Sequence, residues 1–348
     1  MLGYCYHQDK TLRLEEIPKP ALKQGFGAVL RVRACSVCGT DMRTYRFGSA
    51  KIDDGRVIGH EIVGEIAELS PAFSGPFKIG DRVSIAPAIG CGTCVSCKKQ
   101  KTNMCDDLTT IGFQYDGGFA DYMAVPEQAF SMGNVYRLPE DVADDTVFTL
   151  SEPLACAINA QSYLGIGPGD DVLIFGSGII GCMHAELAKL AGAGNIILAE
   201  PQQERLEQAA SLLPDVSFVN SSRQSLSEEV RKLTNGKGVD AAIVACSVGA
   251  AQREGLSLLA KCGRISLFGG LPGDSAGFLD SNLIHYRELS VFGVHASTPA
   301  QNIEAMSLIH RGVLDMKKYI DRRFPLKDVE QAFQEAASGK IMKAVMVN

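Results

Sequence analysis

The chain has 348 residues, of which 46% are hydrophobic and 21% are charged, and its formal net charge is −6. These values are typical of a globular enzyme of about two domains and exclude a largely disordered chain. The negative charge argues against a nucleic-acid-binding surface, because such surfaces are basic. No run of about 18 apolar residues predicts a membrane-spanning helix, and residues 1–10 lack an apolar signal core. We therefore expect a cytoplasmic protein with no membrane or nucleic-acid partner.

Up to about residue 125 the chain consists of short apolar runs broken by Gly and Pro, the pattern of a largely antiparallel β domain. The predicted strands in this part are 28–34, 62–69, 82–86 and 119–125.

From Glu152 onward, strands and helices alternate, which predicts a parallel sheet with crossover helices. The predicted strands are 171–175, 196–199, 239–246 and 264–268. The predicted helices are 152–164, a segment from the 176–181 turn through 191, and 203–213. After 291 we expect helices at 302–311 and 328–337 and a strand at 344–347 that returns to the first domain. The expected fold is thus α/β, with domain segments 1–150, 151–290 and 291–348.

Four cysteines, Cys91, Cys94, Cys97 and Cys105, lie close together in a Gly- and Lys-rich stretch. Their thiolates suit a tetrahedral Zn²⁺ and would fill its coordination sphere, so the predicted site is structural. An iron–sulfur cluster or a zinc-ribbon module would normally show a different spacing. Eleven cysteines without a secretion signal argue against a disulfide framework. The cysteines without a predicted metal role are expected to be core thiols: Cys5, Cys35, Cys156, Cys182, Cys246 and Cys262.

A glycine-rich turn, Gly176-Ser177-Gly178-Ile179-Ile180-Gly181, lies between a predicted strand and a predicted helix. This context makes the G-x-G-x-x-G pattern a dinucleotide-binding motif, with the pyrophosphate at the helix N-terminus. Glu200 closes the next strand, where a carboxylate would bind the adenosine ribose and repel a 2′-phosphate. The motif therefore favours NAD. Arg205 leaves NADP as the alternative, since a nearby arginine can accept a 2′-phosphate, although the residue also fits a solvated helix face.

Three further motifs are scattered along the chain: Cys38-Gly39-Thr40-Asp41, Gly59-His60-Glu61 and Glu152-Pro153-Leu154. Singly, each has an ordinary explanation, such as a buried thiol or a solvated carboxylate. Their order resembles the zinc-containing medium-chain alcohol dehydrogenase family over nearly the whole chain, together with the turn at 176–181, the four clustered cysteines, Gly80-Asp81-Arg82-Val83 and Gly117-Gly118-Phe119-Ala120-Asp121-Tyr122. The resemblance implies a GroES-like catalytic domain divided around a Rossmann domain, with the active site in the cleft between them.

The resemblance also implies the site residues. Simple alcohol dehydrogenases have a cysteine as third zinc ligand, whereas the sorbitol (L-iditol 2-dehydrogenase-like) and threonine dehydrogenase branch has a glutamate, as this chain does at Glu152. By position, Cys38 and His60 bind the catalytic zinc, and Glu61 and Glu152 are carboxylates that bind it or exchange with water. Which of the two carboxylates binds zinc at rest stays open. Thr40 stands at the family's proton-relay position.

One position departs from the family pattern. Many relatives have a histidine five residues after the zinc-binding cysteine, but this chain has Arg43. Arginine does not act as a base. The proton therefore leaves through water or a carboxylate, and Arg43 either binds an anionic substrate or cofactor phosphate or is a solvated side chain. The candidate substrate-lining residues are Arg43, Tyr45, Phe113, Tyr115 and His295.

The predicted function is that of a zinc-dependent NAD(H) oxidoreductase with two Zn²⁺ per chain, one catalytic and one structural. An acid-rich zinc site fits a vicinal diol, which predicts oxidation of a secondary hydroxyl of a polyol, sugar or sugar acid to a ketone. Oxidation of an amino alcohol, as by L-threonine 3-dehydrogenase, is the alternative. An NAD-binding zinc protein without turnover is the rival of a different class, but the open-site ligands would then have no purpose. By resemblance, a homo-oligomer (dimer or tetramer) is expected.

Overall fold

The computed structural model describes residues 1–271 and 279–348. They form two compact units: unit 1 comprises Met1–Ala155 and Ala296–Asn348, and unit 2 comprises Cys156–His295. Both junctions fall slightly later than the 150/151 and 290/291 boundaries expected from the sequence. Helix α4 (Ser151–Leu164) runs through the first junction, and β16 (Ser290–Gly293) still pairs with the sheet of unit 2. Among the described helices, none is both long and apolar enough to cross a membrane.

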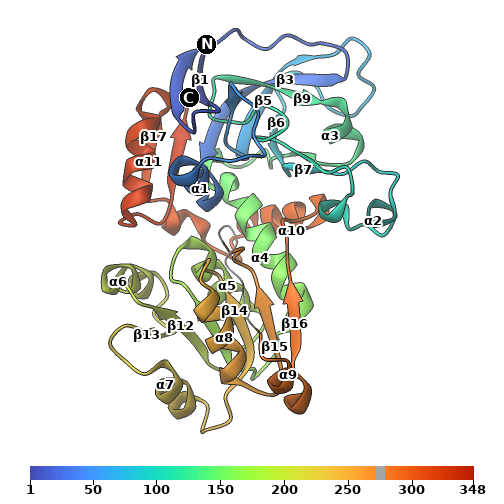
Figure 1. Ribbon diagram of the computed structural model, residues 1–348. Coiled ribbons are helices and arrows are strands. Elements are labelled where there is room, and N and C mark those ends of the chain that lie inside the picture. The colour runs from blue at the N-terminus through green and yellow to red at the C-terminus, as the bar shows by residue number, and fades with distance from the viewer. Residues whose placement is uncertain (272–278) are drawn as a thin grey trace. The chain divides into compact units, whose positions relative to one another are not determined.

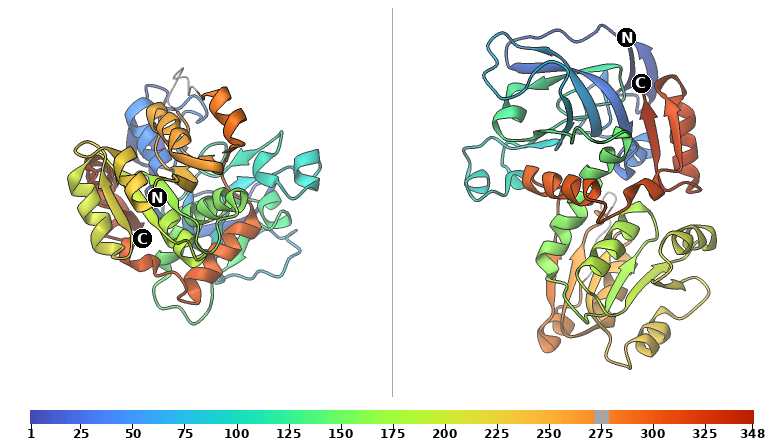
Figure 2. Two further views of the ribbon diagram at one scale, coloured as in Figure 1. Left: turned by 90° about the horizontal axis from the view of Figure 1, so that it is seen from below. Right: turned by 180° about the vertical axis from the view of Figure 1, so that it is seen from behind.

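Unit 1 is built mainly of antiparallel strands, and its C-terminal elements join the N-terminal ones (Figures 1 and 2). Its strands are β1 (Leu2–Tyr6), β2 (Leu12–Glu16), β3 (Phe26–Ser36), β4 (Arg56–Val57), β5 (Glu61–Leu69), β6 (Arg82–Ile85), β7 (Ala88–Ile89), β8 (Thr109–Thr110), β9 (Tyr122–Pro126), β10 (Val135–Arg137), β17 (Arg322–Pro325) and β18 (Ala344–Val347). Its α-helices, apart from the start of α4, are α1 (Gly39–Phe47), α2 (Val95–Lys98), α3 (Glu127–Ser131), α10 (Pro299–His310) and α11 (Val329–Ser338). Short 3₁₀ helices cover Thr102–Met104, Asp145–Leu150, Met316–Tyr319 and Leu326–Asp328.

Strand β3 organises the main sheet of unit 1, whose order is β10-β6-β5-β3-β18-β17 with β9 also paired to β3. The run from Ala28 to Leu30 is fully buried, as expected for a strand covered on both faces. Strand β18 pairs antiparallel with β3 and parallel with β17, so the C-terminal strand lies within the main sheet of unit 1. Phe333 of α11 packs into the core of unit 1, where its ring contacts those of Tyr4 and Phe119 at centroid distances of 5.0 and 5.5 Å.

Unit 2 contains one six-stranded parallel sheet of order β13-β12-β11-β14-β15-β16. Its strands are β11 (Val172–Phe175), β12 (Ile196–Glu200), β13 (Ser217–Asn220), β14 (Val239–Val244), β15 (Leu259–Leu267) and β16. Its helices, beside the rest of α4, are α5 (Ile179–Leu190), α6 (Gln203–Leu212), α7 (Leu226–Leu233), α8 (Gly249–Leu258) and α9 (Ser281–Arg287), most of them labelled in Figure 1. The strand order reverses between β11 and β14. This is the topological switch point at which doubly wound sheets bind ligands.

The predicted α/β class is confirmed, and most predicted elements agree with the observed ones to within a few residues. Two expectations need correction. The strand predicted at 119–125 begins only at Tyr122, because Ala120 makes an isolated bridge to Gly3 and no continuous ladder. Cys262, expected to be a core thiol, is exposed and lies at a φ of 62°, whereas Cys5, Cys35 and Cys182 are buried as expected.

One polar side chain in the core of unit 2 was not expected from the sequence. His184 on α5 is fully buried. Its Nδ1 lies 3.3 Å from Nε2 of Gln161, and its ring packs edge-on against Phe268. Its Nε2 has no hydrogen-bond partner among the described residues. Burial lowers the pKa of His184 to about 3, so the folded protein holds this imidazole neutral.

This burial predicts a loss of stability in mild acid. An unfolded histidine has a pKa of about 6.5. Below that pH the His184 imidazole therefore binds a proton in the unfolded chain but not in the folded chain. Between pH 7 and pH 5 the unfolding free energy should fall by about 2 kcal/mol more in the natural chain than in His184→Leu. Urea unfolding at the two pH values measures this. The control is His285→Gln, at an exposed histidine, in which the fall of the unfolding free energy should be close to that of the natural chain. Equal falls in the natural chain and in His184→Leu would contradict the prediction.

Candidate zinc and dinucleotide sites

The register of two strands assembles the first candidate metal site. Ser36 at the end of β3 pairs with Glu61 at the start of β5, so the residues just beyond, Cys38 and His60, also lie close together. The ligand atoms of Cys38, His60 and Glu61 all lie within 4.8 Å of one another. Gly59 has a φ of 97°, and a Cβ there would lie 2.8 Å from the Phe119 ring. The chain can therefore turn into His60 in this way only with glycine.

Asp41 orients two of these ligands. Its carboxylate accepts a hydrogen bond from the backbone N–H of Cys38 at 2.9 Å and lies 3.5 Å from Nδ1 of His60. Burial alone would lower the pKa of His60, but facing Asp41 and Cys38 raises it well above the ordinary value. A carboxylate at Nδ1 leaves Nε2 for a metal, the arrangement typical of zinc-binding histidines. Thiolate, imidazole and carboxylate donors suit Zn²⁺, so this donor set fits the metal.

The carboxylate of Glu61 is fully buried and is held by two further side chains. Nζ of Lys343, itself 2% exposed, lies 2.8 Å from Oε1 and 2.5 Å from Oε2, and the Ser36 hydroxyl donates to Oε2. Burial lowers the pKa of Lys343, but Glu61, Cys38 and Glu152 together raise it above the ordinary value. Sequence reasoning missed Lys343. The only signal was a lysine within the apolar terminal run from Ile341 to Val347.

Glu152 lies in the first turn of α4 and is 8% exposed. It is not part of the ligand set within 4.8 Å, but its charge is near enough to raise the pKa values of Lys343 and Tyr136. The structure therefore brings Cys38, His60 and Glu61 together as one donor set and places Glu152 in the same charged environment. Its role as a zinc ligand stays a prediction.

The remaining predicted residues of unit 1 are distributed unevenly around this site. Thr40, Arg43 and Tyr45 are exposed on α1, which begins directly after Cys38. The Phe113 ring lies 6.1 Å from that of His60. Tyr45 packs on Phe333, and Tyr115 packs on Phe26 at the start of β3. His295 belongs to unit 2, where its carbonyl accepts a hydrogen bond from Asn159 at 3.4 Å.

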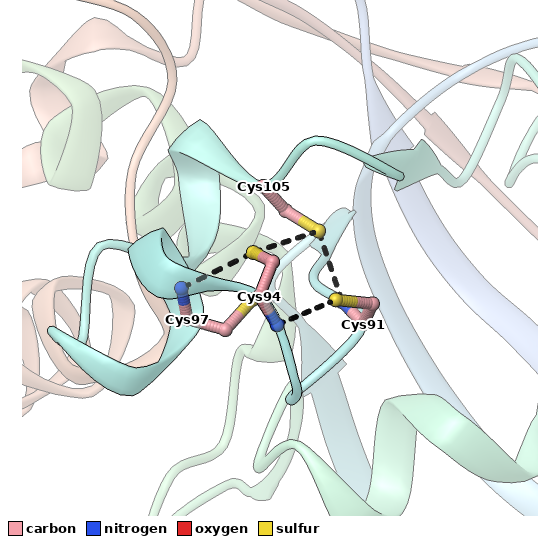
Figure 3. Close-up of side chains that lie close together, drawn as sticks. All are labelled: Cys91, Cys94, Cys97 and Cys105. Atoms are coloured by element: carbon pink, nitrogen blue, oxygen red, sulfur yellow. Dashed lines mark hydrogen bonds between the residues drawn. The ribbon is translucent and has the colours of Figure 1, made fainter.

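The four cysteines form the second candidate metal site, with their side chains turned toward one another (Figure 3). All four sulfurs lie within 4.8 Å of one another. Backbone N–H groups of the same loop donate to the sulfurs: that of Cys91 to Cys105 Sγ at 3.1 Å, and that of Cys94 to Cys91 Sγ at 3.3 Å. Donation from the Thr93 hydroxyl and nearby N–H groups lowers the pKa of Cys91 to about 6, while burial raises that of Cys105 to about 12. The cluster fits a structural zinc.

The glycine-rich turn follows β11 at the switch point of the unit 2 sheet. Gly176 has a φ of 100°, and a Cβ on Gly181 would lie 1.8 Å from the Gly176 carbonyl oxygen. Ile179 and Ile180 begin α5, which exposes its first N–H groups at Gly178. A Cβ on Gly178 would lie 2.6 Å from Nη2 of Arg205. The glycines therefore permit the tight turn at which a pyrophosphate binds in this motif, and the Arg205 guanidinium lies against the middle glycine of the turn.

Glu200 ends β12 with its carboxylate against the same turn. Its Oε2 accepts hydrogen bonds from the N–H and hydroxyl of Ser177 at 3.0 and 3.2 Å, and its Oε1 accepts one from the Gln202 N–H at 3.1 Å. The acidic residue is therefore fixed beside the glycine motif. Arg205 approaches the turn from α6, so both residues predicted to distinguish NAD from NADP lie at the turn.

Comparison with known proteins establishes the family. The model of the alcohol dehydrogenase GroES-like domain matches residues 26–139, and that of the zinc-binding dehydrogenase matches residues 180–311. The chain is 33% identical to L-threonine 3-dehydrogenase of Pyrococcus abyssi over 95% of this chain and 93% of that protein. It is 29% identical to sorbitol dehydrogenase of Bacillus subtilis over 98% and 94% of the two chains. The chain belongs to the zinc-containing medium-chain alcohol dehydrogenase family.

Solved structures agree with this assignment over the whole chain. An alcohol dehydrogenase from Escherichia coli CFT073, solved with NADH, gives a TM-score of 0.89 at 26% identity and covers 100% of this chain and 99% of that one. A zinc-binding dehydrogenase from Sinorhizobium meliloti 1021, bound to NADP, gives 0.88 at 27% identity with the same coverage. The predicted GroES-like and Rossmann architecture is thus confirmed, and the chain is a zinc-dependent dehydrogenase.

The buried pair at Glu61 generates a prediction about stability. Lys343→Met would leave the Glu61 charge in the core without a counter-ion, which typically costs about 3–5 kcal/mol. Lys343→Arg keeps the charge and should recover most of that loss. Exposed Lys340, replaced by Met, is the matched control in the same segment. The measurement is the free energy of urea unfolding, and a loss below about 1 kcal/mol in Lys343→Met would contradict the interpretation.

Proposed function

We propose that the chain oxidises a secondary hydroxyl of a polyol, sugar or sugar acid to a ketone, with NAD⁺ as the hydride acceptor. The observation that carries the proposal is the donor set of half-buried Cys38 and buried His60 and Glu61, whose ligand atoms lie within 4.8 Å of one another, with Glu152 in the same charged environment. With three protein ligands, namely Cys38, His60 and one of the two carboxylates, zinc would keep one position for a substrate oxygen, unlike in the four-sulfur cluster.

The charges of the chain suggest a role for each carboxylate. Lys343 neutralises Glu61, so we assign to Glu61 a place beside the metal and to Glu152 the place of the third protein ligand, next to Cys38 and His60. Together Cys38 and Glu152 would supply two negative charges, which balance those of Zn²⁺. When bound, zinc would supply a Lewis acid that lowers the pKa of the substrate hydroxyl, and NAD⁺ would supply the hydride acceptor.

Thr40 is the residue proposed to move the proton. Its backbone N–H lies 3.5 Å from Cys38 Sγ, and the residue is exposed on α1. Its hydroxyl oxygen can accept the proton of the substrate hydroxyl while its own proton passes outward. Arg43 cannot continue this relay, because its guanidinium does not deprotonate. The proton therefore leaves through water or a carboxylate, and the role proposed for Arg43 is to bind an anionic group of substrate or cofactor.

Glu200 supports NAD over NADP. It is 4% exposed and fixed by three hydrogen bonds, so it cannot swing away from a 2′-phosphate, and the two negative charges would repel each other. Arg205 lies over Gly178, on the pyrophosphate side of the turn. Its charge therefore serves the pyrophosphate that both cofactors share.

Oxidation of L-threonine is the second candidate. It is favoured by the 33% identity to the Pyrococcus enzyme, compared with 29% to the sorbitol dehydrogenase. Threonine and a polyol both place a polar group beside a secondary hydroxyl, so one metal site with several carboxylates suits either substrate. A homo-oligomer remains a prediction from the family resemblance, and a cytoplasmic location remains a prediction from the sequence.

The test is NADH formation with a panel of polyols, sugar acids and L-threonine, each with and without a zinc chelator. We expect turnover of one polyhydroxylated compound, abolished by chelation and restored by Zn²⁺. NADP⁺ in place of NAD⁺ should reduce kcat/KM strongly. Turnover of L-threonine alone would select the second candidate, and saturable NAD⁺ binding without any turnover would favour the non-enzymatic alternative.

The relay makes a separate prediction for Thr40. Thr40→Val keeps the shape of the side chain but removes the hydroxyl, so kcat at neutral pH should fall by about 100-fold, the usual range for a lost proton-transfer group. Thr40→Ser retains the hydroxyl and should stay within several-fold of the natural chain. Zinc content is measured in both variants to show that the metal site is intact. A Thr40→Val enzyme with full activity would exclude the relay.

A further inference from the structure

Three buried hydroxyls gather beside Glu152. They belong to Tyr136 on β10, Ser84 on β6 and Ser151, the first residue of α4. Their exposed fractions are 6%, 2% and 0%. None of them was singled out by the sequence, and none belongs to the metal donor set. A cluster of polar groups this deep in a core requires a compensating function or a set of hydrogen bonds.

The strand register places this cluster on the same sheet face as Glu61. Tyr136 lies opposite Ser84, and Ser84 lies opposite Val63; residues in such opposed pairs point to the same side of the sheet. Val63 is two residues beyond Glu61 on β5 and therefore points to that side as well. The phenol ring of Tyr136 consequently extends over the face that carries the metal-site carboxylate.

The hydrogen bonds of the cluster are incomplete within the described part of the chain. The Ser84 hydroxyl donates to the carbonyl of Ile62 at 2.8 Å, so it can only accept from another group. The hydroxyls of Tyr136 and Ser151 make no hydrogen bond of acceptable geometry with the described residues. Leaving such a group unsatisfied costs about 1–3 kcal/mol. Two adjacent unsatisfied hydroxyls therefore favour a bond to each other.

The surroundings keep the Tyr136 hydroxyl protonated. Burial raises its pKa well above the ordinary value, and the charge of Glu152 raises it further, although Ser84 and Ser151 lower it in part. The phenol is therefore a permanent donor, and the Ser151 hydroxyl is an acceptor that can donate in turn. Glu152 immediately follows Ser151 in the first turn of α4.

We propose that Tyr136 is a positioning residue: its hydroxyl bonds to that of Ser151, ties β10 to the start of α4, and thereby fixes the direction in which Glu152 presents its carboxylate to the catalytic zinc. This inference rests on the proposed function, in which Glu152 is the third protein ligand. It assigns to Tyr136 and Ser151 an effect on the open metal site and none on the four-cysteine cluster.

The test compares Tyr136→Phe with Tyr4→Phe in the full-length zinc-loaded protein. Tyr4 is another buried tyrosine of unit 1, 1% exposed compared with 6% for Tyr136, so both variants lose one phenol hydroxyl at constant ring volume. The readout is the zinc retained per chain during incubation with a chelator. Tyr136→Phe should lose the first zinc about 10-fold faster than the natural chain, as is usual when a group supporting a metal ligand is removed. Tyr4→Phe should stay within about two-fold, and the second zinc should be lost at the same rate in all chains.

A background variant separates positioning from general weakening. If Tyr136 acts through Glu152, Tyr136→Phe should not speed zinc loss further in a Glu152→Ala chain, because the effects of substitutions at interacting residues are not additive. Ser151→Ala should reproduce the effect of Tyr136→Phe, and the double variant should be no faster than either single one. Additive losses in the Glu152→Ala background would overturn the inference.

The outcomes also distinguish this inference from the proposed function. A natural chain that retains only one zinc, held by the four cysteines, would overturn both. A natural chain with two zinc ions and alcohol turnover, in which Tyr136→Phe and Tyr4→Phe lose zinc at the same rate, would overturn only the role of Tyr136.

Discussion

The buried ion pair between Glu61 and Lys343 is the interaction on which the open metal site depends. It joins residues separated by 282 positions, and neither side chain is exposed by more than 2%. A carboxylate removed from water requires a counter-charge, and here that charge comes from the residue directly before β18. Since β18 pairs with β3 next to Ser36, the strand pairing that completes the main sheet also places Lys343 against Glu61.

This coupling explains why a segment returns to unit 1 after the whole of unit 2. Strand β3 already pairs with β5 and β9, so β18 completes the sheet and also delivers a cation to the metal-binding end of β3. Without β18, Cys38 and Glu61 would lie side by side as anions in the core. Glu61 also raises the pKa of Cys38, beyond the effect of burial, because the two negative charges repel each other.

The sequence predicted the local features better than the distant ones, for a physical reason. The cysteine cluster and the glycine turn are each contained in one short segment, so their spacing alone defines the chemistry. The meeting of Cys38, His60 and Glu61 rests on pairing between the distant strands β3 and β5, and it was expected only through the resemblance of the whole chain to a family. Lys343 and Tyr136 were missed because a lysine near a terminus and a tyrosine in a strand are usually solvated or apolar core groups, and burial cannot be read from neighbouring residues. Cys262 was misjudged because the sequence does not reveal the positive φ at this residue or the register shift that interrupts the pairing of β15 with β14 there.

The two candidate metal sites therefore depend on the fold to different degrees. In the cysteine cluster, the ligands and the N–H groups that support them belong to residues 91–107, so a single loop supplies both. The open site takes its ligands from the ends of β3 and β5, its carboxylate environment from α4 and its counter-charge from the C-terminal segment. Four thiolates would fill the coordination sphere of zinc and leave no position for a substrate. A site assembled from several segments can leave one position open. The site proposed to be catalytic is thus the one that forms only when these distant segments have folded together.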